Sequence, residues 1–166
     1  MNTFRVALDE VVGRQLRRDG IVFEDVSIVR IFIDAKDMLE EADFDGALVC
    51  FDELKHSLSG RGNYLVFTCA CGIADDGGWE SVAVDMTDST VNWTMQAGSR
   101  ALNYCFDRTV YVAEIAALGK KLASSALPLE PGQVVFPDDF FPRKDSCSVD
   151  GQKRTQTKDD TSPLIP

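Results

Sequence analysis

Hydrophobic and polar residues alternate along much of the middle of the chain. Val82 and Val84 alternate with small or polar neighbours, and Val91, Trp93 and Met95 do the same. A period of two predicts strands with one buried face. Four short segments separated by turns rich in Gly, Asp and Ser predict an antiparallel meander; they span 63–69, 79–85, 90–95 and 101–106.

A longer period marks two helical segments. Residues 48–58 carry apolar side chains at helical spacing and end at Gly60. A clearer helix follows Asp107, a good N-cap, and Phe106 can pack on its first turn. The apolar stripe of this helix is Tyr111, Ile115, Leu118 and Leu122. We expect the stripe to close the open face of the sheet.

The first forty residues combine strand and helix patterns. Residues 1–20 fit a strand from Thr3 to Leu8 or a helix, and we favour the helix because Leu8, Val11, Val12 and Leu16 recur at helical spacing. The β-branched run 26–33 predicts a strand. Asp34 is then expected to cap a short helix.

These elements predict an α+β fold, an antiparallel meander sheet of about four to six strands with helices packed on one face. The chain has 166 residues, of which 45% are hydrophobic, and this suffices for one domain over 1–142. Residues 134–136 offer an edge strand. Residues 143–166 are polar and are expected to form a flexible C-terminal tail.

The charge balance limits the partners. The chain carries 17 Lys and Arg against 27 Asp and Glu, a net charge of −10. The tail holds five basic and four acidic residues, so the excess of acids lies in the predicted domain. Such a field repels phosphate backbones and attracts basic proteins. We therefore expect no nucleic acid partner.

Hydropathy and cysteine content indicate the compartment. No apolar run approaches the ~20 residues of a membrane span, and the N-terminal residues lack the apolar core of a signal peptide. Five cysteines, an odd number, fit reduced thiols better than a disulfide framework. We expect a cytoplasmic protein with no membrane association.

Cys69 and Cys71 end an apolar run and enter an acidic, glycine-rich turn. Two residues apart on a strand, both thiols would face the same side. A structural zinc site needs about four ligands, and the other candidates are Cys50, Cys105, His56 and the pair Asp75 and Asp76. A Cys69–Cys71 disulfide would close a short, strained ring. We favour two half-buried strand thiols, with metal binding as the alternative and no cofactor expected.

Several short motifs resemble a known group of sequences. They are Phe67-Thr-Cys-Ala-Cys-Gly72, the following Gly-Gly-Trp79, Val91-Asn-Trp93, and Phe106-Asp-Arg-x-x-Tyr111 at the start of a helix. Over roughly residues 26–122 the chain is similar to a loosely defined family of small, uncharacterised bacterial proteins with a Cys-x-Cys-Gly strand signature. That signature continues with a further cysteine, which suggests an ancestral metal site. Here Asp75 and Asp76 stand in its place.

No residue is predicted to be catalytic. His56, the only histidine, lies in an amphipathic helical pattern, and a general base would need an orienting partner and a nucleophile beside it. Asp75 and Asp76 precede two glycines, which is what a hairpin turn requires, although paired carboxylates also bind cations.

The densest acidic cluster is the candidate partner-binding surface. For the charge run taken by itself we favour a solvated helical face, and a docking surface is the functional alternative. An exposed tryptophan beside it would be a natural interface anchor. The candidate residues are Glu40, Glu41, Asp43, Asp45, Asp52, Glu53, Asp75, Asp76 and Trp79.

Two functions remain open. The first is a small acidic cytoplasmic protein-binding domain, of which an immunity protein that neutralises a bacterial toxin or effector is the example that fits best. The second is a metal- or thiol-dependent enzyme or sensor centred on Cys69 and Cys71. We favour the first, with a basic protein as partner and no enzymatic activity. An exposed edge of the meander also leaves a homodimer open.

Overall fold

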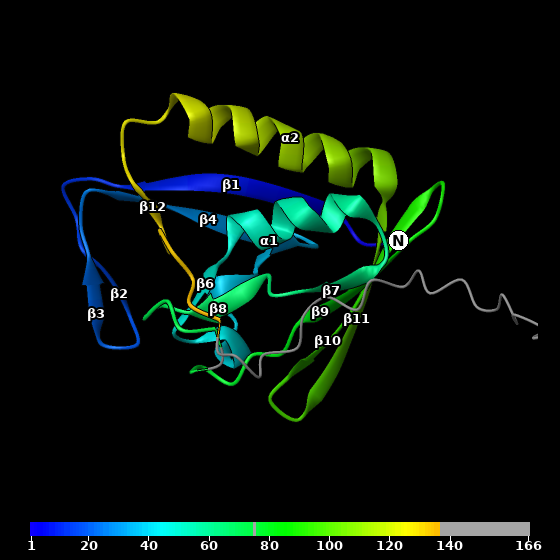
Figure 1. Cartoon of the computed structure of the whole chain (residues 1–166), viewed down its shortest axis with the longest axis horizontal. Coiled ribbons are helices and arrows are strands. Elements are labelled where there is room, and N and C mark those ends of the chain that lie inside the picture. Colours follow the sequence, from blue (N-terminus) through cyan, green and yellow to red (C-terminus); the bar gives the residue numbers. More distant parts are fainter. Residues whose placement is uncertain (75, 137–166) are drawn as a thin grey trace, which may run out of the picture.

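Two antiparallel-rich sheets form the frame of the molecule in the computed structural model, which describes residues 1–74 and 76–136 (Figure 1). In the first sheet β4 (Val26–Ile33) lies between β1 (Phe4–Val11) and β12 (Leu129–Glu130), and β5 (Lys36–Asp37) also pairs with β4. β1 pairs with β4 antiparallel along its whole length, whereas β12 is parallel to β4. This arrangement buries Ile28, Val29 and Ile31 of the central strand.

The second sheet is the predicted meander, except that the predicted strand 63–69 is divided and only its first part joins this sheet. Its strand order is β11–β10–β9–β7, and all neighbours are antiparallel. The strands are β7 (Gly62–Tyr64), β9 (Val82–Met86), β10 (Thr90–Ala97) and β11 (Arg100–Asp107). The buried side chains of β10 are Val91, Trp93, Met95 and Ala97, which alternate as the sequence predicts.

Two small two-stranded sheets complete the β structure. β2 (Leu16–Arg18) and β3 (Ile21–Phe23) form a hairpin, and β6 (Ala47–Val49) pairs with β8 (Phe67–Cys69). The 3-10 helices are η1 (Met38–Glu40), η2 (Ala42–Phe44) and η3 (Ser57–Ser59). With α1 (Phe51–His56) and α2 (Arg108–Ser124), these elements confirm the α+β fold.

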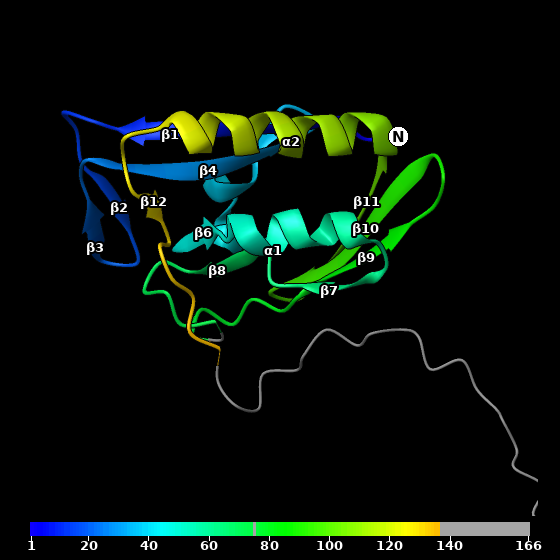
Figure 2. The same cartoon turned by 45° about the horizontal axis from the view of Figure 1, so that its top comes forward.

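The helix α2 lies along β1, as both views show (Figures 1 and 2). Asp107 caps it by accepting a hydrogen bond from the Val110 backbone N–H at 3.0 Å, and Phe106 stacks on Tyr111 with the ring centroids 5.9 Å apart. Glu114 accepts from the Val6 backbone N–H at 3.0 Å, which satisfies a donor of β1. The cap, the aromatic contact and the buried residues Tyr111, Ile115 and Leu118 agree with the sequence prediction.

Two predicted helices near the N-terminus are wrong. Residues 1–20 form β1 and the start of the β2–β3 hairpin, because Asp19 and Gly20 take the positive φ values, +48° and +75°, of a two-residue hairpin turn. Asp34 caps no helix. It has φ +51° and accepts a hydrogen bond from the Thr3 backbone N–H at 2.8 Å.

Two further elements differ from the prediction in extent. The pattern over 48–58 divides into β6, α1 and η3, and it ends at Gly60 as predicted. In place of an edge strand at 134–136, Val135 makes an isolated parallel bridge with Ile73. The predicted tail, 143–166, lies outside the described residues. Within the described part of the chain, no helix is both long and apolar enough to cross a membrane.

Candidate functional site

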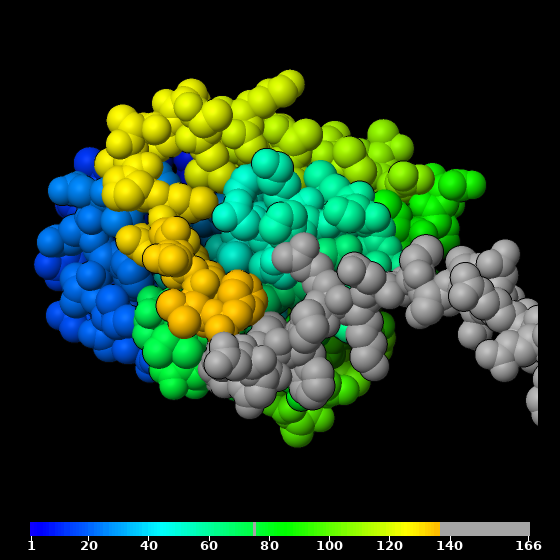
Figure 3. Space-filling model, in the orientation of Figure 1, coloured from blue at the N-terminus to red at the C-terminus, as the bar shows by residue number. Residues whose placement is uncertain are grey.

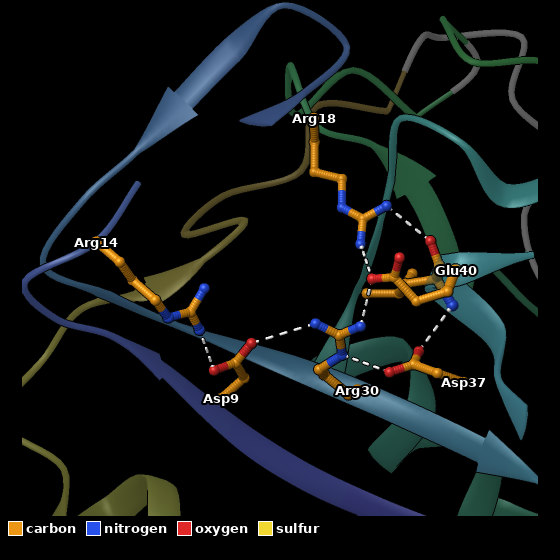
Figure 4. Close-up of polar contacts among 7 residues, drawn as sticks. Asp9, Arg14, Arg18, Arg30, Asp37 and Glu40 are labelled. Carbon is orange, nitrogen blue, oxygen red and sulfur yellow. Dashed lines mark hydrogen bonds and ion pairs between the residues drawn. The ribbon is translucent and has the colours of Figure 1, made fainter. Parts of the chain in front are cut away.

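One of the predicted surface acids, Glu40, pairs with two arginines of the fold. Glu40 contacts Arg18 at 2.8 Å and Arg30 at 2.5 Å, and Arg30 also contacts Asp37 at 2.5 Å and Asp9 at 3.2 Å (Figure 4). The hydrogen bond from Arg30 lowers the pKa of Glu40. We call Asp9, Arg18, Arg30, Asp37 and Glu40 the arginine network. Its acids are structural counter-ions of two largely buried guanidinium groups.

Two other predicted partner residues are also engaged. The Asp43 carboxylate pairs with Arg100. Glu53 is only 6% exposed, and its carboxylate accepts from the Leu65 backbone N–H at 3.1 Å and contacts His56 Nδ1 at 3.2 Å. Glu53 therefore faces the interior, where it joins α1 to the residue that follows β7. An argument from surface charge could not predict this position.

The remaining acids have no cationic partner within residues 1–74 and 76–136. These are Glu41, Asp45, Asp52 and Asp76, which we call the unpaired acids. Asp45, Asp52 and Asp76 are exposed and Glu41 is half-buried. Asp75 lies outside the described residues.

Trp79 lies beside η2 and near the turn of the β2–β3 hairpin. Its indole N–H donates to the Asp43 carbonyl oxygen at 3.0 Å, and the side chain is half-buried against the core. Gly46 separates its ring from Asp19, since a side chain at Gly46 would meet Asp19 Cβ at 3.1 Å and the Trp79 ring at 3.7 Å. Trp79 thus connects the loop after η2 with the turn of the β2–β3 hairpin.

Cys69 and Cys71 meet acids at this same place. Cys69 ends β8 and is 1% exposed, whereas Cys71 lies in the following turn and is exposed. The Cys69 thiol donates to Asp19 Oδ2 at 3.6 Å, and the Cys71 thiol donates to Asp76 Oδ2 at 3.2 Å. We call Asp19, Cys69, Cys71 and Asp76 the thiol–acid corner. Sequence analysis missed Asp19, although an Asp-Gly pair between short apolar runs is a hairpin signal.

The turn that carries Cys71 is held by a distant segment. Val135 N–H donates to the Gly72 carbonyl at 2.8 Å, and Ala74 N–H donates to the Val135 carbonyl at 2.9 Å. Gly72 has φ +82°, and a side chain there would meet the Gln133 carbonyl oxygen at 3.0 Å, so glycine is required. Figure 3 shows the segment 129–136 in orange against the green part of the chain on this face.

The buried thiol of the corner, Cys69, has a perturbed pKa. Burial raises the pKa of Cys69 to about 11, so this thiol is protonated near neutral pH. The thiolate is the nucleophilic form, and a raised pKa disfavours it. The raised pKa therefore argues against Cys69 as an activated nucleophile.

A second cluster of polar groups lines a cleft beside α1. The cleft has a volume of about 370 Å³, and Cys50, Glu53 and His56 line it together with the segment from Leu129 to Phe136. Burial raises the pKa of Cys50, so this thiol is also held neutral. Among the described residues, the only group of three side chains placed to share a metal ion is Cys69, Cys71 and Asp76.

No known family model, curated protein or solved structure matches this chain. We therefore infer the function from the geometry and charge of the chain itself.

Proposed function

We propose that this protein is a small acidic binding domain that docks on a basic protein, in the manner of a bacterial immunity protein that neutralises a toxin or effector in the cytoplasm. It occupies the partner's surface and catalyses no reaction. The observation that carries the proposal is the set of unpaired acids, which are the described acids of the predicted partner surface that remain once Glu40, Asp43 and Glu53 are found engaged within the fold.

The unpaired acids give the partner a place to bind. Asp45 is next to Gly46, which contacts both Asp19 and Trp79, and Asp76 is in the turn after Cys71. Asp45 and Asp76 flank glycines that lie against the half-buried Trp79 ring, and acids beside an aromatic side chain combine attraction at a distance with an apolar contact on docking. Ile73, 42% exposed, and Val135, 58% exposed, add apolar surface next to the same turn.

The charge also explains how such a protein would work without catalytic machinery. Complementary charges raise the association rate and orient the two surfaces before they meet. With a net charge of −10, the chain as a whole attracts a basic partner, and the unpaired acids decide where that partner lands.

The test compares two triple variants of equal charge against the captured partner. Glu41→Gln, Asp45→Asn and Asp76→Asn neutralise three unpaired acids, whereas Glu24→Gln, Asp25→Asn and Asp88→Asn remove the same charge elsewhere. Stopped-flow association at low and moderate salt is the measurement. We expect the first triple to slow association by about 10-fold more than the second and to weaken the salt dependence.

Equal association rates for the two triples would show that only net charge matters and would remove the proposed surface. Failure of any protein partner to bind the wild-type chain would remove the function itself.

A further inference from the structure

The thiol–acid corner brings two sulfur atoms and a carboxylate oxygen to one point. The Sγ atoms of Cys69 and Cys71 and a carboxylate oxygen of Asp76 all lie within 4.8 Å of one another. We propose that these three side chains bind a single divalent cation of the zinc type. This site goes beyond the proposed binding function and does not depend on it.

The backbone already favours the geometry of a two-sulfur chelate. The chain turns directly after β8, and the Cys71 backbone N–H donates to Cys69 Sγ at 3.4 Å. A hydrogen bond to sulfur stabilises the thiolate form that a metal ligand must adopt. The parallel bridge between Ile73 and Val135 fixes the far side of the turn, so Cys71 and Asp76 are carried by a supported loop.

The thiol protons occupy the place that a cation would take. In the metal-free protein each thiol directs its proton toward a carboxylate, Cys69 toward Asp19 and Cys71 toward Asp76. When the cation binds, the two thiol protons pass to solvent and the sulfurs become thiolates. The divalent ion replaces the charge of the two released protons, so the net charge of the corner does not change.

The ligand set selects the class of cation. Two sulfur ligands disfavour Mg²⁺ and Ca²⁺, which require oxygen, and favour Zn²⁺ and the metals that replace it. An iron–sulfur cluster requires about four cysteine ligands, and this site offers two. Three protein ligands leave a fourth position for water.

Asp19 has a distinct part in this site. Its carboxylate contacts Cys69 but does not belong to the group of three, and the hairpin turn fixes its backbone at φ +48°. It therefore orients the buried sulfur from outside. Loss of such an outer partner typically lowers metal affinity by about 10–100-fold.

The experiment is a titration of the reduced full chain with Co²⁺ and Zn²⁺. We expect one Co²⁺ per chain, with a thiolate-to-cobalt charge-transfer band and the intense visible bands of a tetrahedral ion, and displacement of Co²⁺ by Zn²⁺. Cys71→Ala removes a metal ligand and should lower the metal affinity by more than ~100-fold. Asp19→Asn removes only an outer hydrogen-bond partner and should lower the affinity by about 10–100-fold.

The controls separate the site from adventitious binding. Cys71 is exposed, so Cys71→Ala leaves the core intact, whereas Cys69→Ala alone could act through folding. The matched control is Cys105→Ala, which removes one thiol outside the corner and should bind as the wild type does. The proposal is overturned if the reduced protein shows no one-to-one binding, or if Cys71→Ala binds as tightly as the wild type.

Discussion

The arginine network and the thiol–acid corner contain the same kind of acidic side chain in opposite circumstances. In the network, Asp9, Asp37 and Glu40 surround Arg30, and each carboxylate lies within 3.2 Å of a guanidinium nitrogen (Figure 4). In the corner, Asp19 and Asp76 each accept a hydrogen bond from a thiol, and neither pairs with a cation among the described residues. The first region is complete within the fold, and the second has capacity left for a ligand or partner.

The comparison shows why a count of acids in the sequence overstates a binding surface. Of the residues predicted to meet a partner, Glu40 and Asp43 pair with arginines and Glu53 is buried. What remains is a smaller set of acids, of which Asp76 contacts Cys71. Charge that the fold does not neutralise destabilises the compact state and is relieved by binding a cation or a basic surface.

The largest effect should come from breaking the arginine network. Arg30→Met leaves Asp9 and Asp37 without their shared cation in a partly buried site, and we expect the free energy of unfolding in urea to fall by about 3 kcal/mol. The control is Arg14→Met, which removes an exposed pair with Asp9 and should cost less than ~1 kcal/mol. Equal losses for the two variants would show that the network contributes nothing beyond ordinary surface pairs.

A zinc-type cation should stabilise the corner by a comparable amount. At about 100 times its dissociation constant, a ligand that binds only the native state adds ~2.7 kcal/mol. We expect Zn²⁺ to raise the melting temperature of the reduced wild type but not that of Cys71→Ala, and Mg²⁺ to raise neither. A zinc effect of the same size in Cys71→Ala would place the metal elsewhere.

Neutralising two of the unpaired acids should have a small effect on stability, of opposite sign to that of breaking the network. Asp45→Asn with Asp76→Asn removes two exposed carboxylates that have no cationic partner, so we expect the free energy of unfolding to stay constant or rise by ~0.5 kcal/mol. The measurement is urea unfolding without added metal. A loss above ~1 kcal/mol would mean that these acids are structural after all.

The smallest effect concerns pH. Arg30 lowers the pKa of Glu40 below its usual 4.5, so the stabilisation from Glu40 is present above that value and is lost as pH falls through the lowered pKa. We expect the stability difference between wild type and Glu40→Gln to be constant from pH 7 to about 5 and to disappear in more acidic solution. A difference that persists unchanged at acid pH would exclude ionic pairing as its cause.

The sequence predicted best those elements whose signals are local. Asp107, Phe106 and the stripe from Tyr111 to Leu118 lie within a few turns of one helix, and the structure confirms that helix. The alternating residues of β10 confirm the meander in the same way. Helical spacing in residues 1–20 was misleading because the same apolar residues also serve β1 and a hairpin.

The candidate site depends on contacts that spacing does not encode. Asp19 and Cys69 are fifty residues apart and meet only because β8 pairs with β6 beside the β2–β3 turn. The burial of Glu53 follows from its bond to the Leu65 backbone, which an acidic run cannot reveal. β12 escaped prediction because its two residues are too few to show a period.

Native mass spectrometry of the protein purified gently from its own cells shows whether the unpaired acids form its binding surface. We expect the wild-type chain and the Glu24, Asp25 and Asp88 triple to carry one basic protein in stoichiometric amount, and the Glu41, Asp45 and Asp76 triple to carry none. A wild-type chain without any protein partner, or equal retention of the partner by both triples, would contradict it.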